Sequence, residues 1–150
     1  MKRLAVLFAS ICYVFLLTGC IGEEYDFSPP TVFLDSDSRM EQIELQEANI
    51  NWNSDKEYKK ETKDILSLAR KQQQYIVKTG GRDYLTFDSQ DFAIDKINVS
   101  LWKDGKQTPL EINDDDRSFH LPKQDGEYII DVTLHTDSGT AQYVGNLLIK

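Results

Sequence analysis

Side chains that commonly act in catalysis are sparse in this sequence. His120 and His135 are the only histidines, and each falls on the polar phase of a predicted strand, so both are expected to point outward. The sequence has no His-Glu-x-x-His pattern for zinc, no Gly-x-Ser-x-Gly turn and no phosphate-binding glycine loop. A serine hydrolase would also need a serine, a histidine and an acid brought together, which no motif indicates. We therefore expect no catalysis, no cofactor and no metal site.

Two acidic stretches concentrate oxygen ligands of the kind that calcium prefers. They are residues 113–116, Asn-Asp-Asp-Asp, and residues 35–37, Asp-Ser-Asp. Neither has the spacing of a twelve-residue calcium loop, and acidic turns are common in an acidic protein. Surface turns are the preferred interpretation, with calcium binding as the alternative.

The first 20 residues have the pattern of an export signal. Lys2 and Arg3 precede an uncharged run from Leu4 to Leu17, which is too short to span a bilayer comfortably. The small pair Thr18-Gly19 stands directly before Cys20, and this arrangement resembles the lipobox of bacterial lipoproteins. The resemblance implies cleavage between Gly19 and Cys20, lipid on the Cys20 thiol, and a location at the extracytoplasmic face of the cell membrane. An ordinary signal peptide cleaved nearby is the alternative.

This pattern divides the chain into a signal peptide (1–19), a lipidated cysteine with a spacer (20–30) and one domain (31–150). The signal holds two of the 17 basic residues and none of the 25 acidic ones, so the exported part has a formal charge of −10. Such a surface repels nucleic acid. Residues 55–82 are locally basic, which leaves contact with an anionic membrane or wall polymer open beside a plain solvated helix. Cys12 leaves with the signal and Cys20 carries lipid, so no disulfide is expected.

The N-terminal third is predicted to contain two strands and a helix. Residues 31–34 form a short β-branched and aromatic run, and a second strand follows over residues 43–52. The apolar phase of this second strand slips near Gln46-Glu47, which predicts a β-bulge. Ser54 and Glu57 form a capping-box pattern ahead of apolar residues spaced by four and three, so we predict a helix over residues 55–72.

The remainder of the sequence alternates between apolar and polar residues, as strands do. Strands are predicted near residues 75–78, 84–87, 97–103, 110–112, 119–121, 128–134 and 141–149. Asp104-Gly105 supplies a two-residue hairpin turn, and Asp137-Ser138-Gly139 supplies another turn. The spacing is typical of a β-sandwich.

Asp125-Gly126-Glu127-Tyr128, at the start of the penultimate strand, resembles the tyrosine corner of immunoglobulin-like domains. In that family the tyrosine hydroxyl bonds back to nearby backbone. The resemblance covers roughly residues 75–150 and implies a mainly β fold, an antiparallel immunoglobulin-like β-sandwich with one helix inserted in its N-terminal third. Gln124 stands where an aspartate is common and the two core cysteines are absent, which leaves the strand order open.

Trp102 departs from the alternation of its own strand. Ile97, Val99 and Leu101 define the inward phase, so Trp102 falls on the outward phase. Ile129 and Leu148 lie outside the apolar phases of their strands in the same way, and in an immunoglobulin-like order these residues come close together. Either the predicted helix covers this apolar patch, or the patch is open and binds a partner with His135, Thr133 and Gln142 toward its rim.

The expected function is a membrane-anchored bacterial lipoprotein that acts as an extracytoplasmic protein-binding or accessory module without catalysis. The candidate partner-binding residues are Trp102, Ile129, His135 and Leu148. The expected partners are the membrane, through Cys20, and another envelope protein. Two alternatives remain: a small secreted hydrolase, and a cell-wall glycan-binding module that uses Trp52 and Trp102.

Overall fold

Strands dominate the computed structural model, which describes residues 28–150 of the chain. The expected signal peptide (1–19), its cleavage site at Gly19 and Cys20, and the lipidated Cys20 lie outside the described residues. No helix within residues 28–150 is long and apolar enough to cross a membrane. The elements are β1 (Val32–Asp35), β2 (Ile43–Glu44), β3 (Gln46–Asn53), β4 (Glu57–Lys60), α2 (Ile65–Arg70), β5 (Gln74–Val77), β6 (Arg82–Phe87), β7 (Ile94–Lys103), β8 (Lys106–Leu110), β9 (Ser118–His120), β10 (Gly126–Thr136) and β11 (Gly139–Ile149).

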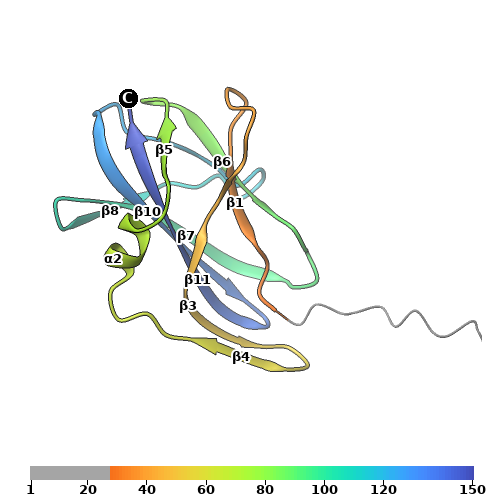
Figure 1. Cartoon of the computed structure of the whole chain (residues 1–150). Helices are drawn as coiled ribbons and strands as arrows, with labels where there is room; N and C mark the ends of the chain where they lie inside the picture. The colour runs from red at the N-terminus through yellow and green to blue at the C-terminus, as the bar shows by residue number, and fades with distance from the viewer. Residues whose placement is uncertain (1–27) are drawn as a thin grey trace, which may run out of the picture.

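The strands form two sheets, and the prediction of a mainly β fold with antiparallel sheets is confirmed (Figure 1). A four-stranded sheet has the order β2-β1-β6-β9, and a seven-stranded sheet has the order β4-β3-β11-β10-β7-β8. The seventh strand, β5, pairs with the C-terminal half of β11 and is the one parallel strand among those described. This arrangement is consistent with a β-sandwich.

One apolar core lies between the two sheets. The four-stranded sheet contributes Val32, Leu34 and Leu85, all at most 2% exposed. The seven-stranded sheet contributes the inward phases of β10 and β11, including the fully buried Tyr143. With no cysteine among residues 28–150, this burial of side chains, and not a disulfide, holds the two sheets together.

The predicted slip in the second strand is present, and it lies closer to the middle of the strand than expected. The chain passes from the four-stranded to the seven-stranded sheet at Leu45, between β2 and β3. The register of β3 against β11 then shifts, because Ala48 and Asn49 together stand opposite Gln142. As a result Ala48 packs on the outer face of the sheet, whereas Ile50 packs in the core.

The predicted helix over residues 55–72 is wrong in its first half. Residues 57–60 form β4 and pair with the edge of β3, and the helix is confined to Ile65–Arg70. The N-cap is Asp64, whose carboxylate accepts from the Ser67 backbone N–H at 2.9 Å, and not Ser54. The capping-box pattern was misleading because the open edge of β3 offers backbone partners that outweigh local helix preference.

The strands predicted in the C-terminal half are confirmed, with their turns. Asp104 and Gly105 have φ of 51° and 75°, the left-handed pair that closes a two-residue hairpin between β7 and β8. β10 and β11 pair along their whole length, from Gly126 opposite Ile149 to Thr136 opposite Gly139.

The folded part begins earlier than the predicted boundary at residue 31. Pro29 and Pro30, which the sequence pattern assigns to the spacer, are buried. The Tyr143 hydroxyl donates to the Pro30 carbonyl at 2.6 Å inside the core. The Pro-Pro pair is therefore part of the domain.

Candidate functional site

Helix α2 covers part of the outer face of the seven-stranded sheet, the face turned away from the core. Beneath it Ala48, Ile129 and Val144 are buried, together with Ala69 of the helix itself. Ile65, Leu66, Leu68 and Trp102 pack around this second apolar cluster. The apolar stripe of the helix is thus buried on the sheet, as the first of the two interpretations predicts.

Trp102 and Ile129 are direct neighbours, because β7 and β10 place them opposite each other. Ile129 is only 5% exposed. The Trp102 indole N–H donates to the Asp131 carboxylate at 3.1 Å, which fixes the ring against the sheet. One side of the indole lines a hollow of about 360 Å³ between α2 and the β7–β8 turn, with Arg70 and Glu127 also in its wall.

Leu148 and His135 lie apart from this cluster. Leu148 is half-buried and stands opposite Ile76 of β5, whose side chain is exposed. The His135 ring lies 3.0 Å from the Asn98 side-chain amide, further down the outer face. The four candidate residues are therefore not one open apolar patch, because Ile129 lies under the helix.

The outer face stays open beyond α2, and there it holds a hollow of about 490 Å³. We call this the outer hollow. It runs across β8, β7, β10 and β11. Its lining includes Thr133 and Gln142, two of the three residues expected at the rim of a binding surface, but not the third, His135. Its lining residues are Ile97, Asn98, Val99, Ser100, Gln107, Pro109, Leu110, Asp131, Thr133 and Gln142.

Asp131 lies at the bottom of the outer hollow and is 5% exposed. The Gln142 amide donates to one of its oxygens at 2.9 Å, and Trp102 and Gln107 donate to the other at 3.1 and 3.5 Å. The Asn49 amide in turn donates to the Gln142 oxygen at 2.6 Å. This hydrogen-bonded chain holds the floor of the outer hollow in one arrangement.

Sequence reasoning did not single out Asp131, although a signal is present. It interrupts the apolar run Ile129, Ile130, Val132 in β10. A charged residue inside an otherwise buried strand is uncommon unless it is paired or hydrogen-bonded. The order of residue types along β10 is therefore enough to mark position 131 as unusual.

The other candidates are not brought together. Neither His120 nor His135 is hydrogen-bonded to a serine or a carboxylate in residues 28–150. The same residues contain no group of three or more His, Cys, Asp or Glu side chains that could hold a metal ion. Trp52 is 2% exposed and stacks edge-on against Phe92 in the core, so it is not available as a glycan-binding platform.

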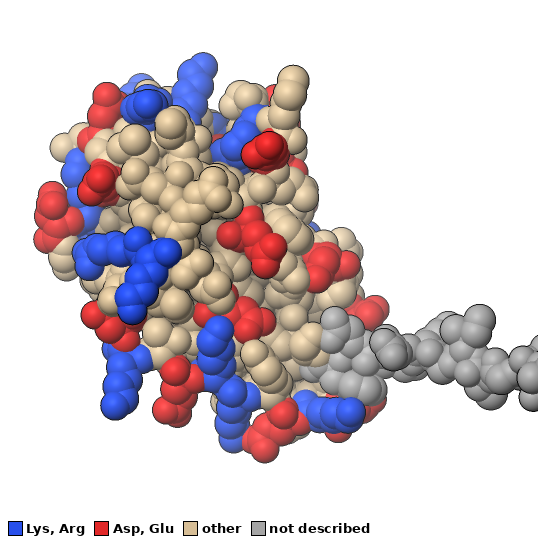
Figure 2. All heavy atoms as spheres, in the orientation of Figure 1, with Lys and Arg blue, Asp and Glu red and all other residues tan. Residues whose placement is uncertain are grey.

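Charged side chains of both signs lie along the lower edge of the molecule in Figure 2, where β4 runs in Figure 1. Lys59 pairs with Glu57, and Lys60 lies 3.7 Å from Glu47. The Tyr58 hydroxyl donates to the same Glu47 carboxylate, and this bond raises the pKa of Tyr58. The lysines of β4 are therefore matched by acids, but they stand on a strand and not on the solvated helix of the plain interpretation.

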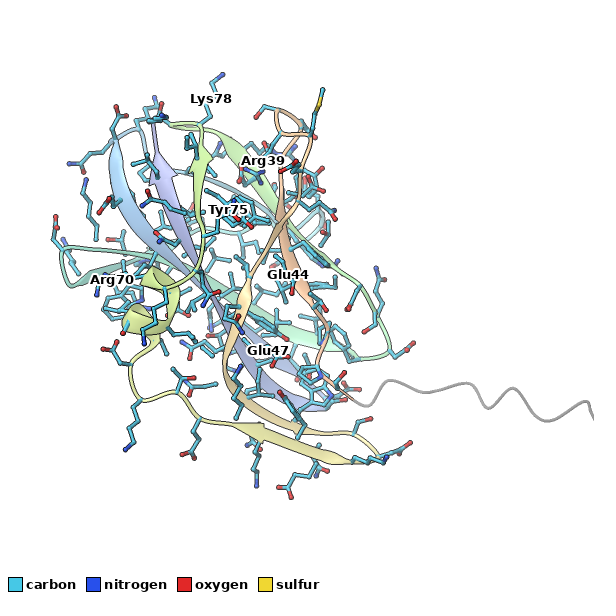
Figure 3. The ribbon with its side chains drawn as sticks, viewed as in Figure 1. Arg39, Glu44, Glu47, Arg70, Tyr75 and Lys78 are labelled. Atoms are coloured by element: carbon cyan, nitrogen blue, oxygen red, sulfur yellow. The ribbon has the colours of Figure 1, made fainter. Side chains whose placement is uncertain are left out.

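Figure 3 labels Tyr75 on β5 and Arg39 between β1 and β2. Tyr75, on β5, packs against the core and closes the sandwich beside β11. Arg39 reaches Asp83 of β6 at 3.2 Å. Burial raises the pKa of the Asp83 carboxyl above its usual value, although the Arg39 guanidinium opposes the shift.

No protein-family model matches the chain, and no curated protein is similar to it.

Proposed function

We propose that this protein is a lipid-anchored envelope module that binds another protein through the open part of its outer face and has no catalysis of its own. The observation that carries the proposal is the outer hollow: its polar floor is held by hydrogen bonds while its mouth is open. A rigid polar surface beside a half-buried tryptophan is typical of a binding site.

An immunoglobulin-like order of strands supports a binding role. The order β8-β7-β10-β11 corresponds to the C′-C-F-G order of variable-type immunoglobulin sheets. The Tyr128 hydroxyl donates to the Gln124 carbonyl at 3.1 Å, as in a tyrosine corner. The analogy is one of fold, and many such sandwiches bind proteins.

The membrane anchor is tested by metabolic labelling. Cells that express the tagged full-length chain are fed an alkyne fatty acid, and the label on the protein is measured. The chain is expected to carry the label, and Cys20→Ser is expected to lose it while the protein is still exported. A labelled Cys20→Ser protein would contradict lipidation at this residue.

The binding surface is tested by crosslinking in the same cells, followed by capture through a C-terminal tag. Thr133→Arg places a bulky charge in the outer hollow. Thr108→Arg makes the same substitution at an exposed residue of β8 that does not line the outer hollow, and so serves as the matched control. We expect a partner that is captured with wild type and with Thr108→Arg and is lost with Thr133→Arg, when both variants are folded by circular dichroism. Equal capture with all three would contradict the assignment of the surface.

A further inference from the structure

Within the described part of the chain, the Asp131 carboxylate forms no ion pair with a basic side chain. The residue is 5% exposed. Its hydrogen bonds come from the neutral side chains of Trp102, Gln107 and Gln142. A carboxylate with so little contact with water is more stable when a positive charge lies beside it.

The Gln107 amide, which lines the outer hollow, has an oxygen that can still accept a hydrogen bond. The Gln107 nitrogen donates to Ser100 at 2.8 Å and lies near Asp131, so its position is set by two acceptors. The Gln107 amide oxygen has no hydrogen-bond partner within the described part of the chain. A ligand in the outer hollow therefore meets a carboxylate that is hydrogen-bonded but has no ion-pair partner among residues 28–150, and an amide oxygen that can accept a further hydrogen bond.

A guanidinium group fits these requirements better than other common groups. It carries a positive charge, five N–H donors and no acceptor, and its planar shape matches a carboxylate. A sugar hydroxyl would also donate, but it would leave the charge of Asp131 without compensation. The formal charge of −10 on the exported part further favours the approach of a basic partner.

We propose that the outer hollow receives an arginine side chain of a protein partner, whose guanidinium pairs with Asp131. The inference rests on the proposed binding function of this surface and names the chemistry of the partner. The Trp102 indole, which already bonds the same carboxylate, lies close enough to report the event.

The test is a nuclear magnetic resonance titration of the full-length lipoprotein in detergent micelles, with the Trp102 indole N–H as reporter. That signal is assigned by its loss in Trp102→Phe. The probe is the peptide acetyl-Gly-Arg-Gly-amide, and the control is the same peptide with citrulline, which keeps the shape of arginine without its charge. The arginine peptide is expected to shift the indole signal saturably. The citrulline peptide is expected to bind at least about tenfold more weakly.

A second arm uses Asp131→Asn, which removes the charge and preserves the size of the side chain. Its titration with the arginine peptide is expected to lose the saturable shift. Two results with the wild-type protein alone would overturn the proposal. One is equal binding of the two peptides, and the other is the absence of a shift with the arginine peptide. Either result leaves the crosslinking test with Thr133→Arg standing, because that test does not depend on the charge of the partner.

Discussion

Trp102 joins the two parts of the outer face. Its ring packs in the apolar cluster under α2, while its N–H bonds the Asp131 carboxylate in the outer hollow. Trp102, which the strand pattern placed on the outward phase of β7, is therefore half-buried and contacts both parts. It supports the helix and orients a carboxylate that faces the solvent-accessible hollow.

Replacement of Trp102 tests this double role. Trp102→Ser is expected to lower the free energy of unfolding by about 3 kcal/mol, because it removes a packed ring and a hydrogen bond to a charged group. Met40→Ser, at a fully exposed apolar residue, is the control and is expected to change it by less than about 0.5 kcal/mol. Urea denaturation followed by circular dichroism measures both. A Trp102→Ser protein as stable as the control would mean that the helix does not pack on the ring.

Asp83 predicts a dependence of stability on pH. Burial raises its pKa in the folded state, so the folded protein holds this proton more tightly than the unfolded chain does. Protonated Asp83 stabilises the folded state relative to the ionised form. This contribution to the free energy of unfolding is complete at a pH below the ordinary aspartate pKa of about 3.9, and it is lost as the pH rises through the raised pKa of the folded state. Asp83→Asn does not titrate at this position.

The stability of Asp83→Asn relative to wild type is therefore expected to increase as the pH rises from about 4 to 7. Urea denaturation of both proteins at each pH gives the difference directly. A difference that stays constant, or that falls with pH, would show that the carboxyl does not titrate as its burial requires.

The positions of individual residues were predictable only where local alternation sets them. The outward phase of Trp102 followed from the strand pattern, and its closeness to Ile129 followed from the strand order that the family resemblance implied. The two residues are observed opposite each other. The burial of Ile129 was one of two interpretations, and the sequence could not decide between them because the burial depends on where the helix lies. Asp131 was overlooked because its hydrogen-bond partners come from three strands that only the fold brings together.

At the scale of elements, α2 is a single short helix whose stability comes from packing. Six residues are too few for an isolated helix to persist in water. Its apolar residues cover part of the outer face. The segment before the helix is bonded to β3, because the Thr62 hydroxyl donates to the Ala48 carbonyl at 2.7 Å. The helix and the β3–β4 hairpin are therefore held to the sheet by contacts that are distant in sequence.

The helix start can be tested by removing its cap. Asp64→Ala is expected to cost about 1 kcal/mol of unfolding free energy, because the Ser67 backbone N–H loses its acceptor. Ser54→Ala, at the position where the capping-box pattern placed the start, is expected to have almost no effect. The two variants are compared by urea denaturation, and a larger loss for Ser54→Ala would restore the longer helix.

The strand pattern succeeded and failed at the element scale for one physical reason. In β7, β10 and β11 the pairing with neighbouring strands agrees with the local alternation of apolar and polar residues. These strands and the Asp104-Gly105 turn were therefore predicted correctly. In residues 55–64 the local pattern favours a helix, but residues 57–60 form a strand that pairs with the edge of β3. Local preferences are weak compared with backbone hydrogen bonds that a sheet edge makes available.

At the scale of the whole molecule, few residues separate the domain from its expected anchor at Cys20. Pro29 and Pro30 are buried, and Ser28 comes only eight positions after Cys20 in the sequence. Such a segment spans at most roughly 28 Å when fully extended. A lipid on Cys20 would keep the domain near the membrane surface, so its partner should also be an envelope protein.

The boundary of the domain predicts the effect of shortening the chain. A protein that begins at Ser28 is expected to unfold at the same urea concentration as the full-length chain. One that begins at Val32 is expected to lose about 2 kcal/mol, because the Tyr143 hydroxyl loses its acceptor, the Pro30 carbonyl. Equal stability of the two shortened proteins would mean that the Pro-Pro pair is not part of the folded unit.

The most direct test of the central claim is photocrosslinking from the outer hollow in living cells. A photoreactive amino acid is placed at position 133 in the hollow, or at position 108 outside it, in the full-length chain. Illumination is expected to join a protein partner to position 133 and not to position 108. Adducts that form equally from both positions, or from position 108 alone, would contradict the proposal that the open outer face is the binding surface.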